Sequence, residues 1–249
     1  MTATQTKSRR PKEDAAPRVA PAVRPDKETT AGYRRKKVVR ITRAKLLDEA
    51  GFNRVLNGVR RDNYPLRNEA LLRLSVFCGL RAQEIAGLQW ERHLLDAHGE
   101  VVHTLRVTQD IAKGRNARIV ERDIPLDPTL RDVLRRLRAA RPNDEFVIYR
   151  LNDPKKFVGG RKNRTEDDSV DPNTLVQFFR RLYAKYGLEG CTSHSGRRTF
   201  ITNLARRCNE EDASLVDVAE LAGHRNLNTT AAYVEPSARQ RKLVTRVFR

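Results

Sequence analysis

Apolar residues recur every three to four positions along most of the chain after Ile41, which is the spacing of the buried face of an amphipathic helix. Thr42 is a suitable residue to cap the first of these segments. Gly79 and Gly223 stand where two of the segments end, as expected of glycine after a helix. We expect helices over residues 42–57, 66–78, 128–140, 172–186, 195–207, 214–222 and 227–233, and a short one from about Arg81.

A second pattern interrupts the helical one. Residues 101–108 and 117–124 alternate between apolar and polar side chains, which predicts two strands joined by the basic turn 113–116. Residues 146–149 predict a third, short strand, and the polar segment 152–171 is long for a loop. The pattern as a whole predicts an α+β fold that is mainly helical and contains one small antiparallel sheet.

Residues 1–39 lack this periodicity, because they hold few apolar side chains and four of the eleven prolines. Such a composition predicts a disordered tail, so we place the one folded domain at 40–249. Before Ile41 the chain has twelve Lys and Arg against four Asp and Glu, a net charge of +8. We expect this tail either to neutralise DNA phosphates or only to aid solubility, and the densest basic run in it is Arg34, Arg35, Lys36 and Lys37.

The charge of the whole chain narrows the function. Lys and Arg number 50 against 31 Asp and Glu, a net charge of +19, which favours a polyanion such as nucleic acid as partner. No apolar run reaches the roughly 18 residues that cross a bilayer, and the N-terminus lacks the apolar stretch of a secretion signal. The cysteines Cys78, Cys191 and Cys208 have no metal-ligand spacing and suit a reducing compartment. We therefore expect a cytoplasmic protein without a membrane partner or a metal.

Several pairs of residues have the chemistry of a phosphate site. His194 and Arg197 are three positions apart at the expected start of a helix, where they share one face and a guanidinium can bind two phosphate oxygens. Tyr233 follows His224 by nine residues, and a phenol becomes a nucleophile when a proton acceptor and cations lie beside it. Taken alone, each pair is more often an ordinary surface pair or a core aromatic residue.

Two further candidates lie earlier in the chain. Arg81 begins a short helix, and Glu84, three residues later, is placed to hold its guanidinium. Lys113 stands at the tip of the expected hairpin, where a lysine can donate a proton to a leaving oxygen. Arg115 and Arg118 in the same hairpin are expected to contact DNA. A salt bridge and a solvated basic turn are the corresponding structural alternatives.

Considered together, these residues resemble the catalytic motifs of the tyrosine recombinases, the family of phage-integrase and Xer-like enzymes. They occur in the family's order, and the resemblance covers about residues 41–240. Its most specific part is the stretch 222–233. The matching segments are 79–84 (GLRAQE), Lys113 with 124–126 (IPL), 194–197 (HSGR) and 221–224 (LAGH) with Tyr233.

The resemblance implies a site-specific DNA recombinase that works through a 3′-phosphotyrosyl intermediate and a Holliday junction. Tyr233 would attack the scissile phosphate, and Arg81 and Arg197 would clamp it. Lys113 would protonate the leaving 5′ oxygen. His194 would assist proton transfer from the tyrosine. No metal, ATP or other cofactor is implied.

The remaining implications concern positioning and partners. His224 would hydrogen-bond the phosphate, and Glu84 would support Arg81. The partner would be double-stranded DNA in the nucleoid, bound by a homotetramer whose C-terminal stretch docks on a neighbouring copy or packs on its own. Only the basic tail precedes the catalytic motifs, as in the compact recombinases that invert fimbrial promoters. An accessory DNA-bending or directionality protein is therefore expected. The alternatives are a DNA-binding regulator that does not cut DNA and a type IB topoisomerase.

Overall fold

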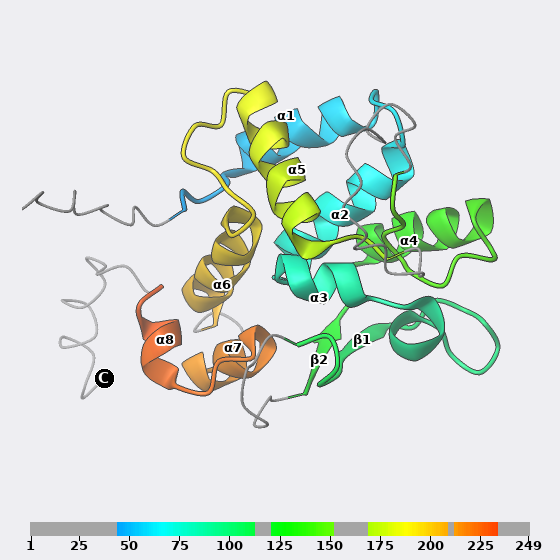
Figure 1. Ribbon diagram of the computed structural model, residues 1–249. Coiled ribbons are helices and arrows are strands. Elements are labelled where there is room, and N and C mark those ends of the chain that lie inside the picture. The colour runs from blue at the N-terminus through cyan, green and yellow to red at the C-terminus, as the bar shows by residue number, and fades with distance from the viewer. Residues whose placement is uncertain (1–43, 113–120, 152–168, 209–211, 234–249) are drawn as a thin grey trace, which may run out of the picture. The chain divides into compact units, whose positions relative to one another are not determined.

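The computed structural model describes residues 44–112, 121–151, 169–208 and 212–233. The expected basic tail, the tip of the hairpin, most of the loop 152–171 and the C-terminal stretch after Tyr233 lie outside these ranges. The helices and strands of the described residues are drawn in Figure 1. They are α1 (Glu49–Val59), α2 (Pro65–Phe77), α3 (Ala82–Gly87), the π-helix η1 (Trp90–Leu94), β1 (Thr104–Val107), β2 (Arg122–Pro125), α4 (Pro128–Ala140), α5 (Pro172–Lys185), α6 (Ser195–Arg207), α7 (Leu215–Ala222) and α8 (Leu227–Ala231).

The mainly helical fold with a small sheet is confirmed, and local chemistry explains most helix starts. Asp127 and Asp171 accept hydrogen bonds from the first backbone N–H groups of α4 and α5, and each of these helices has proline at its first position. Ser214 caps α7 in a reciprocal pair with Asp217. These caps are local, and the periodicity of apolar residues predicts the same helices.

The two strands pair antiparallel, with Leu105 opposite Ile124 and Val107 opposite Arg122. Burial alternates along both strands, so these four side chains all point into the protein. Arg122 is therefore an arginine on the apolar face of a sheet. The sequence predicted a second strand from residue 117, but residues 117–120 lie outside the described ranges.

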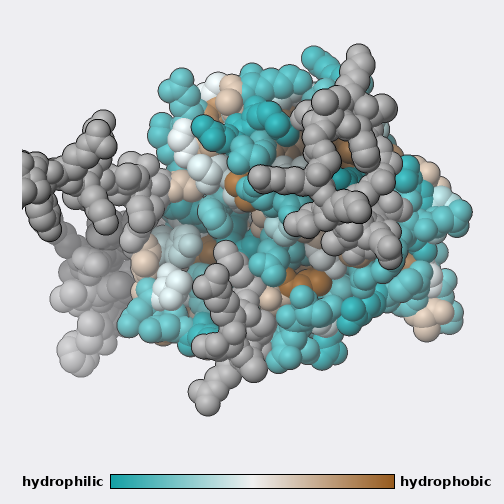
Figure 2. Space-filling view, in the orientation of Figure 1, coloured by the Kyte–Doolittle hydropathy of each residue, from teal (hydrophilic) through white to brown (hydrophobic). Residues whose placement is uncertain are grey.

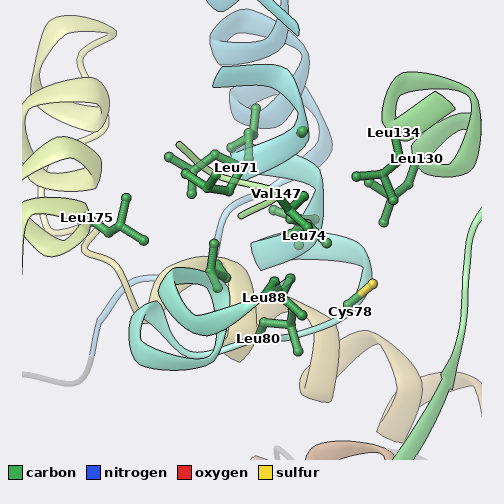
Figure 3. Close-up of a cluster of buried hydrophobic side chains, with 14 of the residues drawn as sticks. Leu71, Leu74, Cys78, Leu80, Leu88, Leu130, Leu134, Val147 and Leu175 are labelled. Atoms are coloured by element: carbon green, nitrogen blue, oxygen red, sulfur yellow. The ribbon is translucent and has the colours of Figure 1, made fainter. Parts of the chain in front are cut away.

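Helix α2 lies at the centre of the main core. It packs against α1, α4 and α6. Figure 3 shows Leu71 and Leu74 of α2 in one cluster of buried side chains with Leu130 and Leu134 of α4 and Leu175 of α5. All of these leucines are fully buried. Leu71 and Leu74 lie on the apolar face of this helix, and tertiary packing buries much of the opposite face as well.

A smaller apolar cluster joins α6 to α7. Ile201 of α6 meets Val218 and Ala222 of α7, and Tyr233 packs against the edge of this cluster. Helix α7 also contacts α8 and β2. Figure 1 shows α6 between α2 and this pair of short C-terminal helices. Segments far apart in the sequence therefore meet where α2 ends and α6 begins.

The strand expected over 146–149 was wrong. Phe146 and Tyr149 form only single bridges, to Gln89 and Ser169. The residues between them are buried without alternation, and Val147 donates its N–H to the carbonyl of Leu88. Burial on every side explains the apolar run, which mimics a strand in the sequence.

The first helix begins at Glu49, seven residues later than expected. Asp48, and not Thr42, supplies the cap by accepting from the N–H of Gly51. The segment before it is bonded to other parts of the chain, because Leu47 donates its N–H to Thr199 Oγ1 at 2.8 Å. The π-helix η1 was not expected at all; in it His93 Nδ1 accepts from the N–H of Gln89.

The surface of the described residues is dominated by polar side chains. Figure 2 shows a mostly hydrophilic face with hydrophobic residues in small separate patches. Among the residues that the structure describes, no helix has the length and apolarity needed to cross a membrane.

Candidate active site

Arg197 lies in the first turn of α6 and is 5% exposed. Its Nη1 donates to the carbonyl oxygen of Gly79 at 2.7 Å, and its Nη2 donates to the carbonyl oxygen of Ala222. Burial and the nearby charge of Arg81 lower the pKa of Arg197 to about 9. The guanidinium thus joins the end of α2 to the end of α7 while remaining a cation at neutral pH.

A close helix contact sets the position of Arg197. A Cβ on Gly196 would lie 2.2 Å from Ser75 Oγ, so only glycine lets α6 approach α2 this closely. Gly79 adopts a left-handed conformation with φ +59°, and the ring of Phe200 covers it. The chain therefore turns sharply at the end of α2 and presents the Gly79 carbonyl to Arg197.

Arg81 follows this turn and caps α3. Glu84 accepts from the Arg81 backbone N–H and from its Nη1, both at 2.8 Å. The Arg81 side chain stays 26% exposed, while that of Glu84 is fully buried. The expected contact between the two is therefore present, and Arg81 keeps a surface that faces solvent.

Glu84 also holds a second arginine. Arg122 of β2 donates from Nη2 to Glu84 Oε2 at 2.9 Å, and from Nε to the carbonyl oxygen of Leu221 at 3.1 Å. Burial by itself would raise the pKa of Glu84, but the charges of Arg122 and Arg81 outweigh it and keep that pKa below its ordinary value. The carboxylate is therefore ionised and shared between two guanidinium groups.

The turn after α7 carries His224. Gly223 has φ +62°, as the sequence predicted for the residue that ends this helix. The N–H groups of Gly223 and His224 return to the carbonyl oxygens of Glu220 and Ala219, both at 2.8 Å. This closed turn directs the imidazole of His224 toward Arg197.

The hydrogen bonds of His224 define its tautomer. Arg197 Nη2, which can only donate, lies 3.2 Å from His224 Nε2, so that nitrogen accepts. Nδ1 therefore carries the proton and donates it to Thr230 Oγ1 at 2.9 Å. Burial, with the charges of Arg197, Arg81 and Arg122, lowers the pKa of His224 to about 4. The ring is neutral at pH 7.

Tyr233 lies just after α8, which brings its ring onto His224. The two ring centroids are 5.8 Å apart with an interplanar angle of 24°, a stacked arrangement. The Tyr233 N–H donates to the carbonyl oxygen of Thr230 at 2.9 Å. Because Thr230 also bonds the imidazole, one buried threonine places both rings.

The other predicted residues are placed less centrally or lie outside the described ranges. His194 caps α6, one turn before Arg197, with an exposed side chain. Lys113, Arg115 and Arg118 fall in the segment 113–120, and the basic run 34–37 falls in the segment 1–43. The structure thus brings together Arg81, Arg197, His224 and Tyr233, with Glu84 beneath them.

Sequence reasoning missed Arg122 and Thr230. The alternating pattern of the strand could have identified Arg122. It lies two residues before Ile124, so both side chains point to the same, buried face of the strand. No pattern marks Thr230, which is fully buried on a five-residue helix. Within the described residues, three guanidinium groups surround the single carboxylate of Glu84, so the site carries excess positive charge suited to an anion.

The described residues contain no group of three or more His, Cys, Asp and Glu side chains that could hold a metal ion. The groups that meet are instead two buried arginines, one partly exposed arginine, a neutral imidazole and a phenol. Cations stabilise charge on a phosphate, and a phenol can attack it. The arrangement is therefore chemically suited to phosphoryl transfer.

Comparison with known proteins finds a matching family model and named relatives. A family model described as "Phage integrase family" matches residues 45–240. The chain is 29% identical over 180 residues to a protein named tyrosine recombinase XerC from Rickettsia prowazekii, and 30% identical to its counterpart from Rickettsia typhi. Each match covers 72% of this chain and 50% of the relative. The chain thus spans about half the length of the curated relatives it matches.

Solved structures show the same fold at low identity. An integrase of the Tn1549 transposon, in complex with a circular intermediate DNA, has a TM-score of 0.60 at 17% identity, over 84% of this chain and 67% of that one. XerH bound to its difH substrate has a TM-score of 0.56 at 19% identity, over 84% and 57%. The XerA recombinase has a TM-score of 0.57 at 17% identity, over 82% and 64%.

Proposed function

This chain belongs to the phage integrase family, and we propose on that premise that it is a site-specific tyrosine recombinase acting on double-stranded DNA. The observation that carries the proposal is the stacking of Tyr233 on His224, which is itself hydrogen-bonded to Arg197. Relatives named as tyrosine recombinases, and structural neighbours that contain DNA, support the substrate class.

In the proposed reaction the phenolic oxygen of Tyr233 attacks the phosphorus of a backbone phosphodiester. The bond to the 5′ oxygen breaks, leaving a 3′-phosphotyrosyl link and a free 5′-hydroxyl. Lys113 supplies the proton that the leaving oxygen takes up, and His194 assists removal of the tyrosine proton. Because the covalent link conserves the bond, a 5′-hydroxyl from a second strand can reverse the step without a cofactor.

The arginines supply the charge stabilisation in this scheme. Arg81 is partly exposed and reaches a phosphate directly, while Arg197 is held by two backbone carbonyls at the depth of the site. Both favour the charge that develops on the non-bridging oxygens in the transition state. Glu84 keeps Arg81 oriented without neutralising the cluster, since it is a single carboxylate among three cations.

His224 would change its role when a phosphate enters. In the structure its Nε2 accepts from Arg197, and burial, together with the charges of the neighbouring arginines, lowers its pKa to about 4. A bound phosphate brings negative charge and draws the Arg197 guanidinium toward it, and both effects favour the protonated ring. His224 would then donate to a phosphate oxygen. Thr230 holds the other ring nitrogen throughout.

The proposal extends to partners and setting. We propose a homotetramer on DNA, assembled through the C-terminal stretch, together with an accessory DNA-bending or directionality protein. We also propose a cytoplasmic, nucleoid-associated location and a likeness to the compact recombinases that invert fimbrial promoters. The excess of positive charge over the whole chain supports the DNA partner.

A covalent-trapping experiment tests this function. Duplexes from DNA flanking the gene carry a nick close to the expected cleavage site, so that the short 5′-hydroxyl fragment diffuses away and traps the intermediate. We expect a protein–DNA adduct on a denaturing gel with the wild type and with Tyr186→Phe, a half-buried tyrosine of the same chain. We expect none with Tyr233→Phe.

Other outcomes have defined meanings. An adduct that persists in Tyr233→Phe excludes this residue as the nucleophile. Tight DNA binding without any adduct favours a regulator that does not cut. Relaxation of supercoiled plasmid, with no exchange of strands between two duplexes, favours the type IB topoisomerase.

A further inference from the structure

Arg122 is a buried arginine beside the candidate site. Its side chain is 3% exposed on the apolar face of β2. A buried guanidinium is costly unless its donors are paired, and here they are paired with two separate parts of the site. One is the carboxylate of Glu84 on α3, and the other is the carbonyl of Leu221 at the end of α7.

The end of α7 explains why the second contact matters. A helix leaves its last carbonyl groups without partners inside the helix. The carbonyls of Ala219 and Glu220 accept from the closing turn, which leaves those of Leu221 and Ala222. Arg122 bonds the first and Arg197 bonds the second. Two cations at the negative end of the helix thus complete the turn that presents His224.

The packing around Arg122 leaves little freedom. A Cβ on Gly223 would lie 3.0 Å from Arg122 Nη1 and 3.2 Å from its Cδ. The residue before His224 is therefore in direct contact with the arginine side chain. The Arg122 side chain therefore packs beside the backbone that carries His224.

Stability alone does not account for an ion pair at this place. Replacing a buried ion pair by apolar residues of similar volume is often neutral or stabilising, and the neighbours of Arg122 in the sheet are apolar. A forked guanidinium differs from an apolar side chain in that it joins two acceptors at defined directions. The guanidinium of Arg122 therefore contributes by fixing the positions of its two acceptors relative to each other.

We propose that Arg122 is a positioning residue for DNA cleavage, which holds Arg81 through Glu84 and holds the His224 turn through the Leu221 carbonyl. This inference rests on the proposed function and deepens it. Arg122 does not touch the phosphate. It sets the distance between the exposed arginine on one side of the site and the imidazole and phenol on the other.

Single-turnover cleavage of the nicked duplex, at saturating protein, measures the effect. Displacement of reacting groups by about 1 Å can cost roughly 100-fold in rate, so we expect a loss of that order in Arg122→Lys and Arg122→Met. The Kd for the same DNA should change little. Lysine keeps the charge but reaches one acceptor at a time, so it should not restore the rate.

Arg67→Lys is the matched control, since Arg67 is equally buried and also donates to a distant carbonyl, that of Tyr149. It should lower stability without lowering the cleavage rate of the folded fraction. Equal rates per folded molecule in Arg122→Lys and Arg67→Lys would overturn the proposal. So would a rate loss in Arg122→Lys that is matched by the loss of folded protein.

Two further measurements separate positioning from a general loss of structure. Glu84→Gln combined with Arg122→Met should cost less than the sum of the single changes, because the two residues act on Arg81 as one unit. Simple additivity contradicts the route through Glu84. Hydrogen exchange at the amides of Gly223 and His224 should accelerate in Arg122→Lys and not in Arg67→Lys.

The exchange measurement does not depend on cleavage. If the wild type forms no adduct, the proposed function fails. If Arg122→Lys leaves the hydrogen-exchange protection of the Gly223 and His224 amides unchanged, Arg122 does not position the turn, whatever the result of the cleavage assay. If the wild type cleaves and Arg122→Lys cleaves equally, the function stands and the positioning role is lost.

Discussion

The guanidinium of Arg197 bonds two backbone carbonyls and an imidazole. Arg81 and Arg122 are instead paired with the carboxylate of Glu84. At the scale of single residues, this division matters because Arg197 retains its full charge toward an incoming anion. Burial and this same charge, with those of Arg81 and Arg122, lower the pKa of His224.

The depressed pKa of His224 predicts how stability depends on pH. Its value is about 4 in the folded protein against an ordinary 6.5, so the unfolded chain binds more protons between these values. The stabilising contribution is complete above about pH 6.5 and is lost as the pH falls toward 4. Urea unfolding at several pH values should show this loss in the wild type.

His224→Gln tests the assignment, because glutamine does not titrate. The difference in unfolding free energy between pH 7 and pH 4.5 should shrink in this variant. His98→Gln, which changes an exposed histidine, should behave as the wild type. If His224→Gln keeps the full difference, other groups cause the pH dependence.

At the scale of elements, the site depends on how closely α6 lies against α2. Gly196 and Ser75 form that contact, and Ser75 Oγ is buried without a hydrogen-bond partner among the described residues. The contact lets Arg197 reach both helix ends. Local helix propensity favours alanine over glycine in α6, so glycine is there for packing.

Gly196→Ala should therefore destabilise the protein by about 1–3 kcal/mol, since a methyl group has to enter a filled space. Ser75→Ala removes an unpaired buried hydroxyl and should be neutral or stabilising. The double variant should recover part of the loss, because the shortest contact of the new Cβ is with Ser75 Oγ. Urea unfolding measures all three. A more stable Gly196→Ala would mean that helix propensity outweighs packing.

At the scale of the whole molecule, the main feature is the net charge of +19, which attracts polyanions. The residues before Ile41 carry a net charge of +8, and under the proposed function we expect this charge to act on the binding of DNA. Contacts with phosphates weaken as salt rises, because binding releases counterions from the DNA.

Replacing Arg34, Arg35, Lys36 and Lys37 by alanine should weaken binding equally for all DNA sequences. The slope of log K against log salt concentration is negative, and its magnitude should decrease by roughly 0.9 for each phosphate that the protein no longer neutralises. Replacing Lys7, Arg9, Arg10 and Lys12 removes the same charge from the same tail and is the control. Equal slopes in the two variants would show a general effect of charge and contradict a specific role for the run 34–37.

The sequence by itself indicated most helices, the small sheet and part of the site, without Arg122 and Thr230. Caps, glycines and periodicity act over a few neighbours, so α4, α5 and α7 could be predicted from local signals. The order of short motifs further indicated the family. The roles of the individual site residues stay predictions, and Lys113 lies outside the described residues.

Only the tertiary structure decided the partners of those residues. It placed Arg122 against Glu84 and the Leu221 carbonyl, 38 and 99 positions away. It also placed Thr230 against the imidazole of His224. It also turned the apolar run 146–149 into buried coil and moved the start of α1 to Glu49. The physical reason is that burial from every side and hydrogen bonds to distant backbone outweigh local propensity, and neither is visible in a pattern of neighbours.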